Sequence, residues 1–124
     1  MEKDEQKRIV SAARKAGYTV IAIPNEGKRG ASVARDLRAM GLTPGVSDLL
    51  FTETVTIEGV TYKGIWLEMK RKGRKEFPNK TEHEKRQAEW LELMRNQGYI
   101  GLWASGAKEA FSKLKPFLPK LKGN

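Results

Sequence analysis

Apolar side chains recur at the spacing of an α-helix in four segments of the chain. In residues 2–16, Ile9 and Ala13 fall on one helical face, and a glycine follows that is suited to end the helix. The same period predicts a short helix at 33–40 and two more at 81–96 and 107–115. The third helix opens with Thr81 and, three positions later, Glu84, which is the pattern of a capping box.

Other segments are expected to be β-strands because their apolar residues run continuously or alternate. The run YTVIAIP (18–24) predicts a well-buried strand, and further strands are expected within 43–55, 60–70 and 99–104. A turn at Glu58-Gly59 should pair the second and third strands as a hairpin. The order helix, strand, helix, two strands, helix, strand, helix predicts an α/β fold, a mixed four-stranded sheet with helices on its faces.

The length of the chain suits one domain with a single modest core, which we assign to residues 1–115. Residues 116–124 are basic and interrupted by proline, so a loose C-terminal tail is expected there. No internal repeat is evident in the sequence.

The chain carries 24 Lys and Arg against 15 Asp and Glu, a formal net charge of +9. Such an excess attracts polyanions, nucleic acid first and an anionic membrane surface second, although small proteins also carry charge for solubility. With no cysteine and one histidine, His83, disulfides and metal sites built from thiolates or imidazoles are excluded. A metal ion would need oxygen ligands, which favours Mg²⁺ or Mn²⁺. No apolar segment approaches the roughly 20 residues of a membrane span, so no membrane association and a cytoplasmic location are expected.

Glu68 and Lys70 interrupt the apolar run of the third predicted strand, in the sequence GIWLEMKRKG (64–73). Because side chains alternate along a strand, both project from the same face as Trp66, about 7 Å apart. Charged groups in a buried strand cost several kcal/mol each unless they are paired or bind a metal. The two residues are therefore candidates for a functional site.

Asp48 precedes the apolar run of the neighbouring strand, so the hairpin would bring it toward Glu68. Two carboxylates at one place repel unless a cation joins them, and Mg²⁺ is commonly held by one or two carboxylates with waters and phosphate oxygens. Such a site activates water for attack on phosphorus, and Lys70 could orient that water and stabilise developing charge. An ion pair at the strand ends, between Lys70 and either acid, explains the spacing equally well.

Two further polar residues lie on apolar helical faces. Glu5 stands four residues before Ile9, and Gln87 precedes Trp90 at helical spacing. Buried polar side chains need partners, so both could converge on the site around Asp48. Each taken alone is more often a residue at the boundary of a core.

Four segments, in their order along the chain, resemble the virus-type replication-repair nuclease domain (VRR-NUC), a branch of the PD-(D/E)xK nuclease superfamily: PNEGKR, MGLTPGVSDLLF, WLEMKRKG and EKRQAEWLELMRNQGY. The resemblance extends from about Glu5 to Trp103 and depends on the order of the motifs rather than on any single one. It implies a restriction-endonuclease-like core and Mg²⁺-dependent hydrolysis of DNA phosphodiester bonds, with Mn²⁺ able to substitute.

Carried over residue by residue, the resemblance gives Asp48 and Glu68 as the two acids of the catalytic motif and Lys70 as its lysine. Gln87 corresponds to the glutamine on the helix that follows the sheet. Ser47 stands where the family pattern has proline, a difference that concerns backbone shape rather than chemistry.

Glu5 corresponds to the glutamate of the family's first helix, with Glu2 and Asp4 as alternatives if the match slips by one turn. The set of metal ligands that the resemblance implies is Asp48, Glu68, Glu5 and the backbone carbonyl of Met69.

Basic residues flank the motif positions. They are Lys28, Arg29, Arg71, Lys72, Arg74 and Lys75. Contacts from these side chains to phosphates would position DNA without reading its sequence, so recognition by shape is expected. The resemblance implies branched DNA, such as Holliday junctions or flaps in replication, repair or recombination, together with a homodimer and a phage or bacterial source. A non-catalytic basic nucleic-acid-binding module is the alternative.

Overall fold

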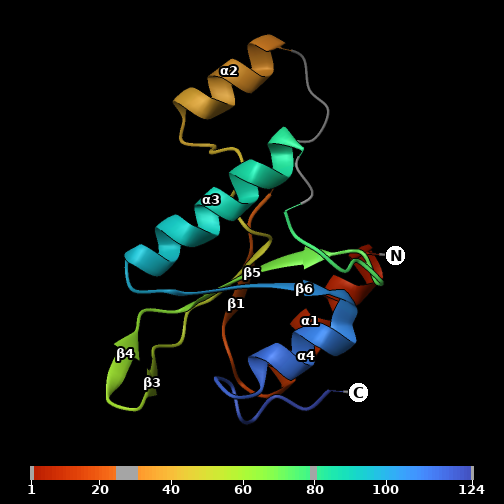
Figure 1. Cartoon of the computed structure of the whole chain (residues 1–124), viewed down its shortest axis with the longest axis vertical. Coiled ribbons are helices and arrows are strands. Elements are labelled where there is room, and N and C mark those ends of the chain that lie inside the picture. The colour runs from red at the N-terminus through yellow and green to blue at the C-terminus, as the bar shows by residue number, and fades with distance from the viewer. Residues whose placement is uncertain (1, 25–30, 79–80, 124) are drawn as a thin grey trace.

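The computed structural model of the chain describes residues 2–24, 31–78 and 81–123. Its elements are α1 (Glu2–Lys15), β1 (Val20–Ala22), α2 (Ala31–Ala39), β2 (Leu49–Phe51), β3 (Val55–Ile57), β4 (Val60–Tyr62), β5 (Ile65–Lys70), α3 (Glu82–Asn96), β6 (Ile100–Ser105) and α4 (Gly106–Leu114) (Figure 1). None of the helices in the described part of the chain combines the length and the apolar character that crossing a bilayer requires.

The main sheet has four strands in the order β1-β2-β5-β6. β1 and β2 are antiparallel, β2 and β5 are antiparallel, and β5 and β6 are parallel. The parallel pair is connected through α3, as a parallel connection requires. The predicted α/β fold with a mixed four-stranded sheet is therefore confirmed.

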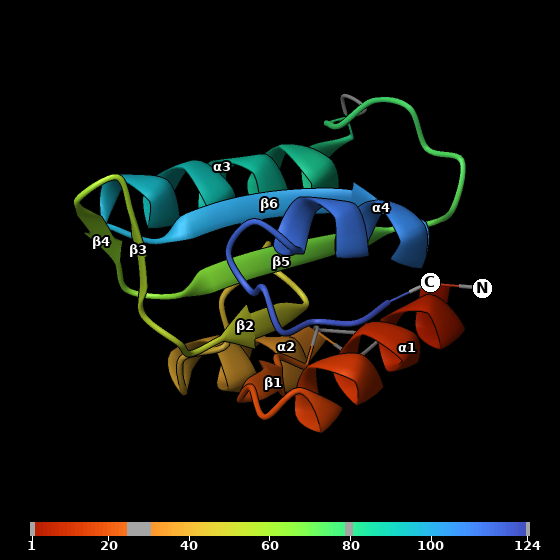
Figure 2. The same cartoon turned by 90° about the horizontal axis from the view of Figure 1, so that it is seen from below.

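Helices cover the two faces of the sheet, with α3 on one side of β5 and β6 and α1 on the other (Figure 2). The core on the side of α1 and α4 includes Ile65, Leu67 and Met69, whereas Trp66 packs with Leu91 and Met94 of α3 on the opposite side. This alternation along β5 is the one that the sequence predicts.

The first strand is shorter and more exposed than the sequence predicts. The expectation of a well-buried strand over residues 18–24 is wrong, because β1 spans three residues and Ile21 is 45% exposed. The physical reason is its place at the edge of the sheet, where it pairs with β2 alone and only Val20 enters the core.

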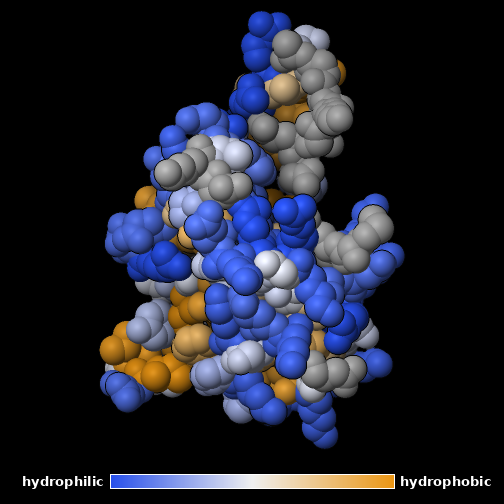
Figure 3. Space-filling view, turned by 45° about the vertical axis from the view of Figure 1, so that its right-hand side comes forward, coloured by the Kyte–Doolittle hydropathy of each residue, from blue (hydrophilic) through white to orange (hydrophobic). Residues whose placement is uncertain are grey.

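Helix α2 forms where expected but contributes little to the core. Val33 is exposed and Met40, just beyond the helix, is 83% exposed. In Figure 1 the helix stands apart from the sheet, at the top of the view. Figure 3 shows one face of the molecule, which is largely hydrophilic and has apolar surface gathered mainly at its lower left.

The predicted hairpin is present but divided into two ladders. β3 and β4 pair as a separate two-stranded sheet with Val55 opposite Tyr62, whereas β2 and β5 pair in the main sheet with Leu49 opposite Leu67. Three residues (52–54) connect β2 to β3, but two (63 and 64) connect β4 to β5, so the pairing shifts by one residue between the ladders.

The C-terminal segment is packed, contrary to the expectation of a loose tail over residues 116–124. Leu118 and Leu121 are buried in the core cluster of α1 and α4. The backbone N–H of Lys120 donates a hydrogen bond to the hydroxyl of Tyr18 at 3.0 Å. Burial of two leucines outweighs the local effect of the prolines, so the segment is part of the fold.

Leu118→Ala is expected to lower the free energy of unfolding by about 2–5 kcal/mol, because Leu118 is 1% exposed and its removal leaves a cavity. Urea denaturation followed by circular dichroism measures the change. Met40→Ala is the control, since truncating an exposed side chain should change stability by less than about 0.5 kcal/mol. Equal effects of the two substitutions would contradict the packed arrangement of the tail.

Candidate active site

Glu68 and Lys70 lie at the C-terminal end of β5 and both are buried, with exposed fractions of 2% and 8%. Their strand runs through the centre of the sheet, and both side chains point to the α3 side. Ionised groups in this position are stable only if their charges and hydrogen-bonding capacity are satisfied.

Gln87 of α3 joins the two charged side chains. Its amide Nε2 donates to Glu68 Oε2 at 3.0 Å, and its Oε1 accepts from Lys70 Nζ at 2.5 Å. The prediction that Gln87 points inward is confirmed, since the residue is buried. One amide thus uses its donor and its acceptor to fix the carboxylate and the ammonium relative to each other.

Glu84 is a member of this cluster that the sequence analysis missed. Its Oε2 lies 3.2 Å from Lys70 Nζ, and its Oε1 accepts from Arg74 NH2 at 2.7 Å. Thr81 Oγ1 accepts from the backbone N–H of Glu84, as in a capping box, but the Glu84 carboxylate turns toward the sheet. Its position three residues before Gln87, on the same helical face, is the signal that could have identified it.

The ammonium of Lys70 is enclosed by three groups, two from α3 and one from the loop before it. Besides Gln87 and Glu84, the ring of Phe77 lies below it, with 4.9 Å from Nζ to the ring centroid. Phe77 in turn contacts Trp103 of β6 at a centroid distance of 5.5 Å. Lys70 is therefore held in one place instead of extending into water.

Asp48 lies directly before β2 and faces the end of β5. The register pairs Leu49 with Leu67, and one step further along it Asp48 stands opposite Glu68. Asp48 Oδ2 accepts from the backbone N–H of Met69 at 2.7 Å, so the carboxylate ends the ladder between the strands. The register thus places Asp48 and Glu68 opposite each other on neighbouring strands, and the meeting of their carboxylates at one metal ion stays a prediction.

The donor set around Asp48 and Glu68 suits a hard divalent cation in part. No group of three or more histidine or acidic side chains among the described residues is arranged to hold a metal. Two carboxylates are enough for Mg²⁺, which retains waters and takes further oxygens from substrate phosphates. The Met69 N–H bonds to one oxygen of Asp48, and the Gln87 amide bonds to one oxygen of Glu68. Because a carboxylate has about four lone-pair sites, these hydrogen bonds are compatible with coordination of a metal ion by the same carboxylates.

Glu5 lies in α1, on the side of the sheet opposite to α3. Its Oε2 accepts from the backbone N–H of Ala107, at the start of α4, at 2.9 Å and from Arg8 at 3.2 Å. These bonds connect α1 to α4 and do not lead to Asp48 or Glu68. The structure thus gives Glu5 a role in helix packing, and its role as a metal ligand stays a prediction.

Four basic residues after β5 lie close together, and their role in binding DNA stays a prediction. Arg71, Lys72, Arg74 and Lys75 line one shallow depression together with Gly73 and Glu76. Arg74 differs from the others, because its guanidinium is partly buried against Glu84. Lys28 and Arg29 fall outside the described residues.

The arrangement can bind and orient a phosphate ester. Two acids provide oxygen ligands, a fixed ammonium lies on the same strand, and cations follow directly in the chain. Groups of this kind stabilise negative charge that develops on phosphoryl oxygens.

Comparison with known proteins identifies the fold. No protein-family model matches the chain, and no curated protein matches its sequence. A solved structure described as "VRR_NUC domain protein" matches with a TM-score of 0.67 over 97% of this chain and 89% of that chain, at 17% sequence identity. The chain therefore has the fold of a VRR_NUC domain protein.

Proposed function

We propose that the chain is a metal-dependent, structure-selective endodeoxyribonuclease of the PD-(D/E)xK type. The observation that supports this most strongly is the alignment of Asp48 with Glu68 across neighbouring strands, with Lys70 fixed two residues further along β5. The match to the fold of a VRR_NUC domain protein agrees with it.

Asp48 and Glu68, together with the backbone carbonyl of Met69, would hold Mg²⁺ or, in its place, Mn²⁺. When bound, the metal supplies a site where water loses a proton more readily and where charge on the phosphoryl oxygens is offset. Attack by water forms one oxygen–phosphorus bond while the bond from phosphorus to the departing sugar oxygen breaks; the proton of the water passes to solvent, and the departing oxygen takes up a proton from solvent.

The chain's own residues position the reacting groups. Lys70 donates to the attacking water or to a phosphoryl oxygen, where its charge stabilises the transition state. Gln87 holds Lys70 and Glu68 in their relative positions through two hydrogen bonds. Arg71, Lys72 and Lys75 hold the neighbouring backbone phosphates, which favours recognition by shape over sequence.

Branched DNA, such as Holliday junctions or flaps in replication, repair or recombination, is the proposed substrate. A homodimer is the proposed assembly, because a two-fold axis would relate two active sites to two paired strands. Both proposals rest on the resemblance of the sequence motifs to the VRR-NUC family.

The proposal predicts cleavage that requires Mg²⁺ and both Asp48 and Lys70. Labelled linear duplex, flap and four-way-junction DNA are incubated with the protein and Mg²⁺, and the products are separated on a denaturing gel. Asp48→Ala and Lys70→Ala should reduce cleavage by about a thousand-fold, a loss of roughly 4 kcal/mol of transition-state stabilisation. EDTA should have the same effect.

Asp36→Ala and Lys115→Ala are matched controls, since both residues are exposed and lie outside the site. They should cleave as the unaltered protein does. Binding of all three DNAs without cleavage, in Mg²⁺ and in Mn²⁺, would instead identify a non-catalytic nucleic-acid-binding module.

A further inference from the structure

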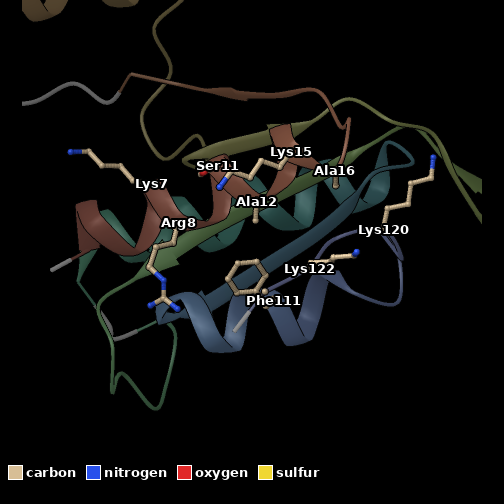
Figure 4. Close-up of a pocket in the computed structure, with 10 residues that line it drawn as sticks. Lys7, Arg8, Ser11, Ala12, Lys15, Ala16, Phe111, Lys120 and Lys122 are labelled. Carbon is tan, nitrogen blue, oxygen red and sulfur yellow. The ribbon is translucent and has the colours of Figure 1, made fainter.

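A basic cavity of about 650 Å³ lies between α1 and the C-terminal segment, away from Glu68 (Figure 4). The cations that line it are Lys7, Arg8, Lys15, Lys120 and Lys122. The other lining residues are Ser11, Ala12, Ala16, Phe111 and Gly123, so no acidic side chain lines the cavity in the described part of the chain. The cavity is therefore strongly attractive to an anion.

Packing of the C-terminal segment fixes two of these cations. Leu118 and Leu121 are buried in the core. Lys120, which lies between them in the chain, and Lys122, which follows Leu121, are exposed. The hydrogen bond from the Lys120 backbone to Tyr18 anchors the segment further. The buried leucines therefore hold the backbone at Lys120 and Lys122 beside the cavity, and the two exposed side chains form part of its lining (Figure 4).

Phe111 of α4 supplies an apolar surface in the middle of the cavity. Figure 4 shows its ring beneath α1, between Arg8 and Lys122. The backbone of Gly123 passes close to the ring, because a Cβ built at Gly123 would come within 2.0 Å of it. A ligand of this cavity would thus meet an aromatic ring in a lining that also carries cationic side chains.

We propose that this cavity binds a nucleotide unit of single-stranded nucleic acid, with the phosphates at the lysines and the base or sugar against Phe111. Sites that take small molecules measure about 300–1,000 Å³, so a cavity of about 650 Å³ is large enough for a nucleotide. Single-stranded nucleic acid is bound by this combination of a positive groove and an aromatic surface.

The position of the cavity agrees with a strand that continues to the candidate active site. A second hollow, between α1 and β1, shares Lys7, Ser11 and Lys15 with the first, and Asp48 lies in its wall. Lys3 and Arg14 of α1 line the same hollow. The surface of α1 thus carries cations from the neighbourhood of Asp48 to Phe111, which is the path that an unpaired strand would take.

Binding of a fluorescein-labelled oligothymidylate, measured by anisotropy in EDTA, tests the proposal. The double variant Lys120→Gln/Lys122→Gln should bind about tenfold more weakly at low salt, and the slope of log Kd against log salt should fall by about 1.4, or 0.7 for each lost phosphate contact. Lys63→Gln/Lys115→Gln removes the same charge from exposed positions outside the cavity and is the matched control.

Phe111→Leu separates nucleotide binding from simple attraction of charge. The variant should weaken binding of the oligonucleotide by about fivefold, as expected for loss of base stacking, and leave binding of inorganic polyphosphate unchanged. Thermal unfolding of each variant confirms that the fold persists.

Equal losses in the cavity variant and the control variant would overturn the proposal. Equal binding of oligonucleotide and poly-glutamate, with no effect of Phe111→Leu, would also overturn it and indicate a general site for anions. Because the measurement uses neither metal nor cleavage, its failure is distinguishable from failure of the nuclease proposal.

Discussion

Glu84→Ala is expected to lower the free energy of unfolding by about 3–5 kcal/mol, which is the cost of breaking a buried ion pair by removing one partner. Glu84 neutralises Lys70, which is 8% exposed, and also binds Arg74 at 2.7 Å. Without it, the buried ammonium keeps, among the described residues, the Gln87 amide and the Phe77 ring as its neighbours. Urea denaturation of the purified variant measures the loss.

Glu82→Ala is the matched control for this measurement. Glu82 lies in the same first turn of α3 and pairs with Lys85 at 3.5 Å, but its side chain is 76% exposed. Exposed pairs contribute about 0–1 kcal/mol, so the control should lose no more than that. A loss for Glu84→Ala as small as that of the control would show that Lys70 is solvated and not enclosed.

The double variant Lys70→Met/Glu84→Leu tests the same ion pair by removing both charges at once. Replacing both buried charges by apolar groups of similar volume is often neutral or stabilising. We therefore expect the double variant to regain most of the stability that Glu84→Ala loses, although Arg74 then loses its carboxylate partner. It should have no nuclease activity, because the lysine of the proposed mechanism is absent.

Glu68→Gln is expected to reduce Mg²⁺-dependent DNA cleavage by about a thousand-fold while leaving the fold intact. The substitution removes a charged metal ligand, and an effect of roughly 4 kcal/mol corresponds to that factor. The carboxamide has nearly the same shape and can still accept the hydrogen bond from Gln87 Nε2. Initial rates on the preferred DNA, with and without Mg²⁺, measure the change.

Glu92→Gln makes the same chemical change on an exposed side chain of α3, which is 66% exposed and 3.6 Å from Arg95. Its cleavage rate should equal that of the unaltered protein. If Glu68→Gln kept full activity while Asp48→Ala lost it, Glu68 would not be a metal ligand and the site would need different acids.

The part of the fold that could be predicted is the part where sequence period and burial agree. Along β5, residues 65, 67 and 69 enter one core and Trp66 enters the other, as strict alternation requires. Helix α3 begins after Thr81 because its hydroxyl accepts from the backbone N–H of Glu84. In both places a short-range rule and the tertiary structure favour the same conformation.

Prediction failed where neighbours in space decide the outcome. The run 18–24 is apolar throughout, yet β1 lies at the edge of the sheet and leaves Ile21 exposed. Leu118 and Leu121 follow prolines in a segment too short to show a period, and only contact with α1 and α4 buries them. Neither position in the fold is encoded by the local pattern.

The residues of the candidate site that lie on or next to strands could be predicted from the sequence, whereas those on helices could be predicted less well. Glu68 and Lys70 interrupt an apolar run, so their cost of burial draws attention to them, and Asp48 directly precedes the apolar run of the neighbouring strand. Glu84 was missed because the capping-box pattern already accounted for it, although its carboxylate binds Lys70 and Arg74 instead. Glu5 was assigned from helical spacing, but that spacing does not specify the partner, which is the start of α4.

The unequal connections on the two sides of the β3–β4 hairpin limit how this chain can change in length. Residues 52–54 and residues 63 and 64 differ in number by one, and this odd difference brings Leu49 opposite Leu67. Deleting one residue from 52–54 would make the two connections equal in length, so the ladder of β3 and β4 could continue into that of β2 and β5 with Leu49 still opposite Leu67, whereas deleting residue 63 or 64 would leave three residues opposite one. Chains related to this one should therefore tolerate the loss of one residue at 52–54, while the turn at Glu58 and Gly59, where both residues have positive φ, should keep its length.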